Sequence, residues 1–162
     1  MLRPAIRENG VGRGPIYMSA DSRPSRAARA FLDTHILVYA QDAASPLKRQ
    51  RSRELITEVA VAGTGVISTQ VLQEFFVTAT ATLGVDPLAA KAVLKTFAIF
   101  EIVQASPRLI EDAIDCSVVN RLAFWDALIV TAASAAGCGI LYSEDLNAGQ
   151  AILGVRIENP FS

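Results

Sequence analysis

The stretch AFLDTHILVYA, residues 30–40, places one aspartate between two apolar runs. The first run, AFL, has the length and composition of a short buried strand, and HILVYA continues as a helix. Asp33 would then end the strand and begin the helix, where its carboxylate can accept hydrogen bonds from free backbone N–H groups. An ionisable side chain in this position therefore either caps the helix or belongs to a functional site.

The composition is that of one globular domain. The 162 residues are 51% hydrophobic and 19% charged, with a formal net charge of −1. This excludes a disordered chain and a strongly basic surface over the whole molecule. Cys116 and Cys138 have neither zinc-ligand spacing nor the pattern of a disulfide framework, so we expect buried free thiols and a cytoplasmic protein. No apolar run reaches about 18 residues, so no membrane span is expected.

The N-terminal part of the sequence differs from the rest. Residues 1–28 contain few large apolar side chains and many Arg, Gly and Pro residues. We expect a disordered basic extension, which either contacts RNA or has no role in the folded domain. Met18 is an alternative start of translation. The folded domain is expected to span residues 29–162.

From residue 30 onwards, short β-like runs alternate with longer helical patterns. Strands are expected at AFLD (30–33), GVIST (65–69), EIVQ (101–104), GILYS (139–143) and VRIENP (155–160). Ser45 can cap one intervening helix with Pro46 in its first turn, and Gly63 and Gly84 can end two helices. The Ala-rich segment FWDALIVTAASAAGCG (124–139) is expected to be a central buried helix. This alternation predicts an α/β fold with a mainly parallel central sheet flanked by helices.

Four acidic residues fall at strand ends or early in helices, and we call them the four acids: Asp33, Glu74, Asp126 and Asp145. The carboxyl ends of parallel strands form one rim of a sheet, where ligands bind in open α/β folds. Close carboxylates repel one another and raise each other's pKa unless a cation intervenes, and oxygen ligands in this number suit Mg²⁺ or Mn²⁺. Taken singly, each acid also has a structural explanation as a helix cap, a favourable charge at a helix N-terminus or a solvated residue.

With these motifs, the sequence resembles the PIN-domain ribonucleases, and most closely the VapC-type toxins of type II toxin–antitoxin pairs. The resemblance covers about residues 31–161 and rests on FLDTHILVYA, ISTQVLQEF, FWDALIVTAA, LYSEDLNAG and IENPF. It implies a three-layer PIN-like fold and Mg²⁺-dependent hydrolysis of RNA phosphodiester bonds. A cognate antitoxin and a homodimer, formed through the helices of residues 46–100, are also implied. All of the four acids match positions that bind metal in this family and are expected to be catalytic. His35 stands where many members carry Asn and others carry His.

Several neighbours of the four acids have supporting assignments. Thr34 and Ser143 can donate hydroxyl hydrogen bonds to a carboxylate or to a metal-bound water. His35 is expected to hydrogen-bond near Asp33 or to pack, rather than to act as a general base. In the turn after GILYS, the family match places Asp145 in the acidic site, and we expect Glu144 to face solvent or a nearby base.

Candidate contacts to RNA lie on two helices. Arg121 is the preferred phosphate contact, because it is close in sequence to FWDAL, whereas most of KRQRSR (48–53) is expected to be a solvated helix face. Phe124 and Trp125 either stack on a base or, as the apolar helix favours, pack in the core.

Two other functions are compatible with the sequence. A phosphatase-type α/β domain would use Asp33 as a nucleophile, but such domains usually carry a second acid two residues later, where this chain has His35. A non-catalytic module would hold a partner peptide in an apolar groove. Metal-dependent RNA cleavage distinguishes the enzyme from the binding module.

Overall fold

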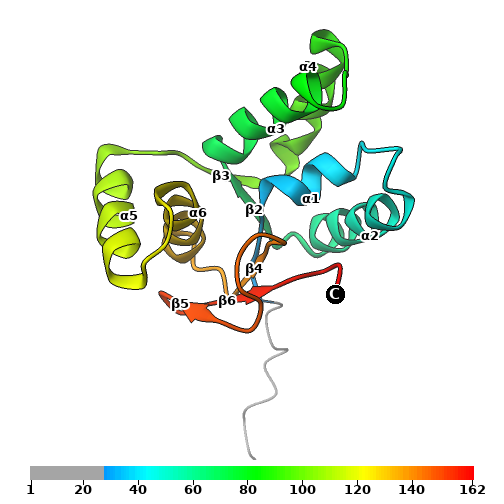
Figure 1. The fold of residues 1–162 in the computed structure, drawn as a ribbon. Coiled ribbons are helices and arrows are strands. Elements are labelled where there is room, and N and C mark those ends of the chain that lie inside the picture. The colour runs from blue at the N-terminus through cyan, green and yellow to red at the C-terminus, as the bar shows by residue number, and fades with distance from the viewer. Residues whose placement is uncertain (1–27) are drawn as a thin grey trace, which may run out of the picture.

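The computed structural model of the chain describes residues 28–162 (Figure 1). The expected basic extension and the alternative start at Met18 lie outside these residues, apart from Ala28. The elements along the chain are β1 (Ala30–Leu32), α1 (Thr34–Tyr39), α2 (Pro46–Ala62), β2 (Gly65–Ser68), α3 (Thr69–Ala81), α4 (Pro87–Thr96), the 3₁₀ turn η1 (Phe97–Ile99), β3 (Glu101–Val103), α5 (Pro107–Asn120), α6 (Phe124–Ala135), β4 (Ile140–Tyr142), β5 (Ala151–Ile152) and β6 (Val155–Glu158).

A six-stranded sheet in the order β3-β2-β1-β4-β6-β5 forms the centre of the domain. The first five strands in this order are parallel, and β5 is antiparallel to β6. The predicted α/β fold with a mainly parallel sheet is therefore confirmed, but the sequence analysis missed β5. That strand has two residues and joins β6 through Leu153 and Gly154, both with positive φ. Two residues are too few to show the alternation by which a strand is recognised.

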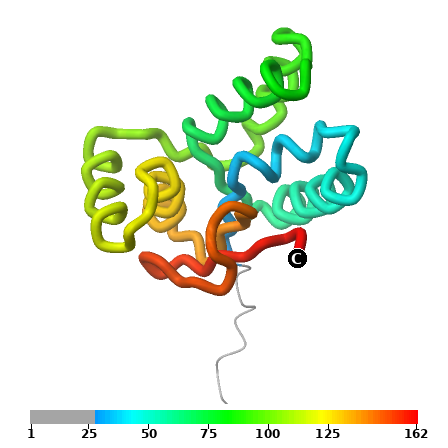
Figure 2. The backbone as a smooth tube through the Cα atoms, in the orientation of Figure 1, coloured from blue at the N-terminus to red at the C-terminus, as the bar shows by residue number. Residues whose placement is uncertain are grey.

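Helices cover both faces of the sheet. Helices α5 and α6 lie on one side, and α1 and α2 lie on the other (Figure 1). The strands β1 and β2 are buried along their whole length, as expected for parallel strands covered on both faces. The segment after β6 returns to lie beside α2, as the backbone trace shows (Figure 2). This layering brings the ends of β1 and β4 close to the first turns of α1 and α6.

Helix α6 is the central buried helix that the sequence predicted. Its residues 127–133 are all buried, and Ala127, Val130 and Ala133 have no exposed surface. Small side chains at these positions let α6 approach the sheet closely, and it contacts β2, β4 and β6. The first turn of α6 is less buried than the rest, so residues 124–126 remain accessible.

The expected helix ends are mostly confirmed. Gly63 ends α2 with φ 65°, Gly84 follows α3 with φ 66°, and Pro46 opens α2. Ser45 occupies the N-cap position of α2 as expected, but its side chain makes no capping hydrogen bond there. The backbone of Ser45 has φ −120° and ψ 68°, outside the extended conformation that most capping residues adopt.

Both cysteines are free and buried, as predicted. Burial raises the pKa of the Cys138 thiol to about 11, so it stays protonated. Within residues 28–162, no single helix is long and apolar enough to cross a membrane; α5 and α6 reach that length and apolarity only together, with a bend of 115° between them.

Candidate active site

Asp33 lies between β1 and α1, as the sequence predicted. It is the N-cap of α1, and its Oδ1 accepts a hydrogen bond of 2.7 Å from the backbone N–H of Thr34. Its Oδ2 accepts a second bond of 2.7 Å from the Ser143 hydroxyl. Burial raises the pKa of Asp33, although these two hydrogen bonds act in the opposite direction. The N-cap of α1 is therefore a carboxyl group whose ionised form is disfavoured by burial.

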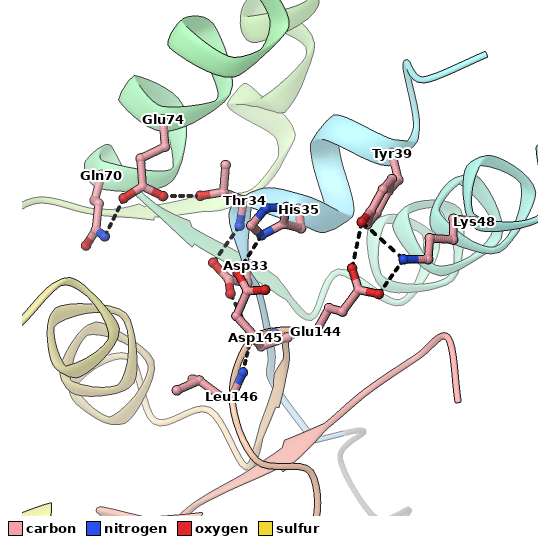
Figure 3. Close-up of polar contacts among 11 residues, drawn as sticks. Asp33, Thr34, His35, Tyr39, Lys48, Gln70, Glu74, Glu144, Asp145 and Leu146 are labelled. Carbon is pink, nitrogen blue, oxygen red and sulfur yellow. Dashed lines mark hydrogen bonds and ion pairs between the residues drawn. The ribbon is translucent and has the colours of Figure 1, made fainter. Parts of the chain in front are cut away.

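Glu74 on α3 is held by donors from two helices. Thr34 Oγ1 donates to Glu74 Oε2 at 2.7 Å, and Gln70 Nε2 donates to Glu74 Oε1 at 2.7 Å (Figure 3). The same Gln70 nitrogen lies 3.2 Å from the backbone carbonyl of Trp125 and donates to it as well. Gln70 was missed in the sequence analysis. Its spacing of four residues from Glu74, which places both on one face of α3, was the available signal.

The turn after β4 brings Asp145 next to α1. Ser143 Oγ accepts hydrogen bonds from the backbone N–H groups of Asp145 at 3.3 Å and Leu146 at 3.4 Å. Asp145 Oδ2 lies 2.9 Å from His35 Nδ1, and both side chains are about half exposed. His35 therefore does not pack in the core; its ring nitrogen forms an ion-pair contact with Asp145 beside Asp33. Asp33, His35 and Asp145 each offer one ligand atom, and these three atoms lie within 4.8 Å of one another.

Asp126 lies in the first turn of α6 and is half-buried. Its pKa is raised first by burial and then by the nearby carboxylates of Asp145 and Glu74. The carboxylate of Glu74 likewise acts to raise the pKa of Asp33. Each of the four acids therefore lies close enough to another of them for their charges to repel. The close group of Asp33, His35 and Asp145 does not include Glu74 or Asp126.

The negative charge of the four acids has no basic partner other than His35 in the part of the chain that the structure describes. The ion pairs of lysine and arginine in these residues all involve other carboxylates. Uncompensated carboxylates at the carboxyl edge of a parallel sheet are an arrangement that a divalent cation stabilises.

A family model described as PIN domain matches residues 30–151. The chain belongs to the PIN-domain family. No curated protein matches the sequence with significance.

Solved structures with this fold include VapC proteins. VapC20 from Mycobacterium tuberculosis, described as a sarcin-ricin loop cleaving toxin, has a TM-score of 0.60 at 18% identity over 72% of this chain and 89% of its own. VapBC2 from Rickettsia felis, bound to a DNA fragment from its promoter, has a TM-score of 0.61 at 19% identity over 80% and 97%. DNA-bound VapBC from Salmonella typhimurium has a TM-score of 0.58 at 19% identity over 82% and 98%. These likenesses agree with the fold of this PIN domain.

A second polar network lies beside the acidic site of the PIN domain. The Tyr39 hydroxyl donates to Glu144 Oε2 at 2.7 Å, and Lys48 forms an ion pair with the same carboxylate (Figure 3). Lys48 Nζ also lies 4.5 Å from the ring centroid of Tyr39 and 5.4 Å from that of Phe161. Burial alone would raise the pKa of Glu144, but the hydrogen bonds from Lys48 and Tyr39 outweigh it and lower the pKa. Glu144 thus faces a base, as expected, and not the four acids.

The remaining basic candidates have mixed outcomes. In the run 48–53, Arg51 pairs with Glu58 on the surface of α2, which agrees with a solvated face, whereas Lys48 belongs to the Glu144 network. Arg121 is exposed at the C-terminal end of α5 in a left-handed conformation, with φ 54°. Its contact with a phosphate stays a prediction.

The two aromatic residues of α6 differ in burial. Phe124 is half-buried against the core, as expected. The expectation that Trp125 packs in the core is wrong, because 61% of its surface is exposed. Adjacent side chains on a helix point about 100° apart, so a narrow core-facing side cannot accept both rings.

Proposed function

We propose that this PIN domain is a metal-dependent ribonuclease that acts as the toxin of a toxin–antitoxin pair. The observation that carries the proposal is the cluster of the four acids, which lack a lysine or arginine partner among the described residues. The names of the similar structures support it, since one is a toxin that cleaves the sarcin-ricin loop and two are VapBC complexes. We extend their toxin role and their protein partner to this chain.

The site fits a hard divalent cation, which we propose to be Mg²⁺, with Mn²⁺ as a substitute. Asp33 and Asp145 offer carboxylate oxygens close to one another. The carboxylates of Glu74 and Asp126 would add further negative charge around the ion. The positive charge of the ion would stabilise the ionised forms of Asp33 and Asp126. It would thus act against the burial and repulsion that raise their pKa values. A bound Mg²⁺ lowers the pKa of a coordinated water and stabilises charge on a phosphate.

The protein side chains would hold the carboxylates in place for this chemistry. The Ser143 hydroxyl fixes one oxygen of Asp33, while Thr34 and Gln70 each fix one oxygen of Glu74. Such supporting hydrogen bonds orient metal ligands and keep the carboxylates from rotating away. His35 would orient Asp145 in the same way through its 2.9 Å contact.

The partners of this proposed toxin are an RNA substrate, an antitoxin and a second copy of the chain, in the cytoplasm. Exposed apolar side chains on the helices of residues 46–100 support a protein interface there: Leu47, Val61, Leu88 and Ile99 are each at least 69% exposed. A partner that covers these side chains would remove their apolar surface from water.

Cleavage of RNA by the purified full chain tests the proposal. We expect cleavage with Mg²⁺ or Mn²⁺, loss of cleavage in EDTA and recovery when the metal is returned. Asp33→Asn, purified in the same way, should be inactive and so exclude a contaminating nuclease. Cleavage that persists in EDTA, or that Asp33→Asn retains, would contradict a metal-dependent site built on the four acids.

A further inference from the structure

Trp125, the one tryptophan of the sequence, presents its ring to solvent directly beside an acid of the site. Its surface is 61% exposed, and Asp126 is the next residue. A single exposed apolar side chain is common on protein surfaces and means little by itself. Trp125, however, also makes two contacts that relate it to the acidic site.

Trp125 is held in a defined relation to the acidic site by two contacts. Its ring packs edge-on against Phe124, with ring centroids 5.2 Å apart and planes inclined by 67°. Its backbone carbonyl accepts a hydrogen bond from Gln70 Nε2, and the same nitrogen donates to Glu74. One side chain therefore connects the backbone of Trp125 to a carboxylate of the site. These contacts restrict the position of Trp125, and a restricted group loses less entropy when a ligand binds.

The same face of α3 continues into a shallow, open hollow. A cavity of about 230 Å³ is lined by Gln73, Glu74, Val77 and Thr78, and Val77 is 60% exposed. Along this face, Gln70, which bonds to the carbonyl of Trp125, comes first, and Glu74 lies about 6 Å further along the helix axis and lines the hollow itself. Exposed apolar surface near Glu74 therefore comes from Val77 in the hollow, and Trp125 adds its exposed ring.

We propose that Trp125 binds the RNA substrate by stacking on an unpaired base next to the phosphate that is cleaved. This proposal rests on the proposed ribonuclease function. The four acids repel phosphates, so contacts to uncharged bases add affinity that the acids do not oppose. A base can offer its face to an aromatic ring only where it is free of the duplex stack, and stacking accepts any of the four bases. The ring therefore selects unpaired RNA without selecting a sequence.

Fluorescence of the single tryptophan reports this contact directly. The test uses the full chain with Asp33→Asn, so that the RNA stays intact, and a ten-nucleotide single-stranded RNA of mixed sequence. Stacking should quench the emission of Trp125 in a saturable way, and the same RNA annealed to its complement should quench much less. Because this readout needs no cleavage, it is independent of the ribonuclease assay.

Affinity for the same RNA with a fluorescent label, measured by anisotropy, provides the second arm. Trp125→Ala should weaken binding roughly 5- to 150-fold, the range expected for loss of one stacked base. Trp125→Phe should keep most of the affinity, and Val118→Ala, at a 75% exposed position on α5, should leave it unchanged.

Three results would overturn the role of Trp125: no quenching, equal quenching by the duplex, or unchanged affinity in Trp125→Ala. The last result would leave a protein partner as the group that covers the exposed ring. If the unaltered chain cleaves RNA while any of these results is found, only the stacking proposal fails and the ribonuclease function stands.

Discussion

Glu144 and Asp145 are adjacent in the chain, but their carboxylates have different partners. Glu144 accepts a hydrogen bond from Tyr39 at 2.7 Å and pairs with Lys48, whereas Asp145 lies 2.9 Å from His35 beside Asp33. The turn is fixed between them by Ser143, whose hydroxyl accepts from the backbone of Asp145 and donates to Asp33. The charge of Glu144 is therefore compensated, and the charge of Asp145 is available to a cation.

This division predicts unequal effects of two conservative substitutions. Asp145→Asn should weaken Mn²⁺ binding and RNA cleavage by about tenfold or more, because it removes a charged contact worth roughly 2–4 kcal/mol at a catalytic site. Glu144→Gln should change either quantity by only a few-fold, since the amide oxygen of glutamine can still accept from Lys48 and its NH₂ group can donate to the Tyr39 hydroxyl. Parallel metal titrations of the two variants measure the difference. If Glu144→Gln is the more damaged protein, the assignment of the turn is wrong.

Lys48 supports the same turn from α2. Lys48→Met should leave the Glu144 carboxylate without its ion pair. The turn that positions Asp145 then loses a support, and we expect this loss to outweigh the attraction of the freed negative charge for a cation. Changes in groups that orient metal ligands typically cost 10- to 100-fold in metal affinity, and we expect roughly tenfold here. Lys48→Arg, which keeps the charge, should bind Mn²⁺ nearly as well as the unaltered chain. Equal losses in both variants would mean that Lys48 acts through packing between Tyr39 and Phe161.

The metal-free protein should be destabilised by Asp33 at neutral pH. The pKa of Asp33 is raised by burial above the ordinary 3.8, so the folded state binds its proton more tightly than the unfolded state. Between 3.8 and the raised pKa, stability therefore increases as pH falls and decreases as pH rises. Asp33→Asn removes this cost while keeping a side chain that can bond to Thr34 and Ser143.

Thermal unfolding in EDTA measures the effect. At pH 7, Asp33→Asn should unfold a few degrees above the unaltered chain, which corresponds to about 1 kcal/mol for a domain of this size. Its stability should also depend less on pH between 4 and 7. Added Mg²⁺ should raise the unfolding temperature of the unaltered chain more than that of the variant. A variant that unfolds earlier than the unaltered chain in EDTA would show that the hydrogen bond from Ser143 to the second carboxylate oxygen of Asp33 is worth more than the relief of its charge.

The sequence predicted those features that depend on local patterns. Apolar runs with Gly and Pro at their ends located five of the six strands, and they placed Asp33 between a strand and a helix. The positions of the acids followed from the rule that parallel strands end on one edge, once the family resemblance was recognised. Ser143 and Thr34 could be named because each lies within two residues of one of the acids and carries a hydroxyl that can donate to a carboxylate.

Features that depend on contacts distant in sequence were not predictable. Lys48 and Glu144 are 96 residues apart, and within its basic run Lys48 has no distinguishing pattern. Trp125 was assigned to the core because its helix is apolar, but the composition of a helix does not reveal which side of its first turn faces the sheet. His35 was placed near Asp33 correctly, yet its contact with Asp145 depends on the turn after β4.

Toxicity in bacteria tests the proposed biological role. Expression of the full chain without an antitoxin should arrest growth, because a ribonuclease that is not blocked degrades RNA that the cell needs. Asp33→Asn should abolish the arrest. Asp86→Asn is the matched control, since Asp86 is also an aspartate N-cap, on α4, but does not belong to the four acids. It should remain toxic, because asparagine is an equally good N-cap. If all three proteins are harmless at equal expression levels, the toxin assignment is wrong. If Asp33→Asn is as toxic as the unaltered chain, the arrest does not arise from the acidic site.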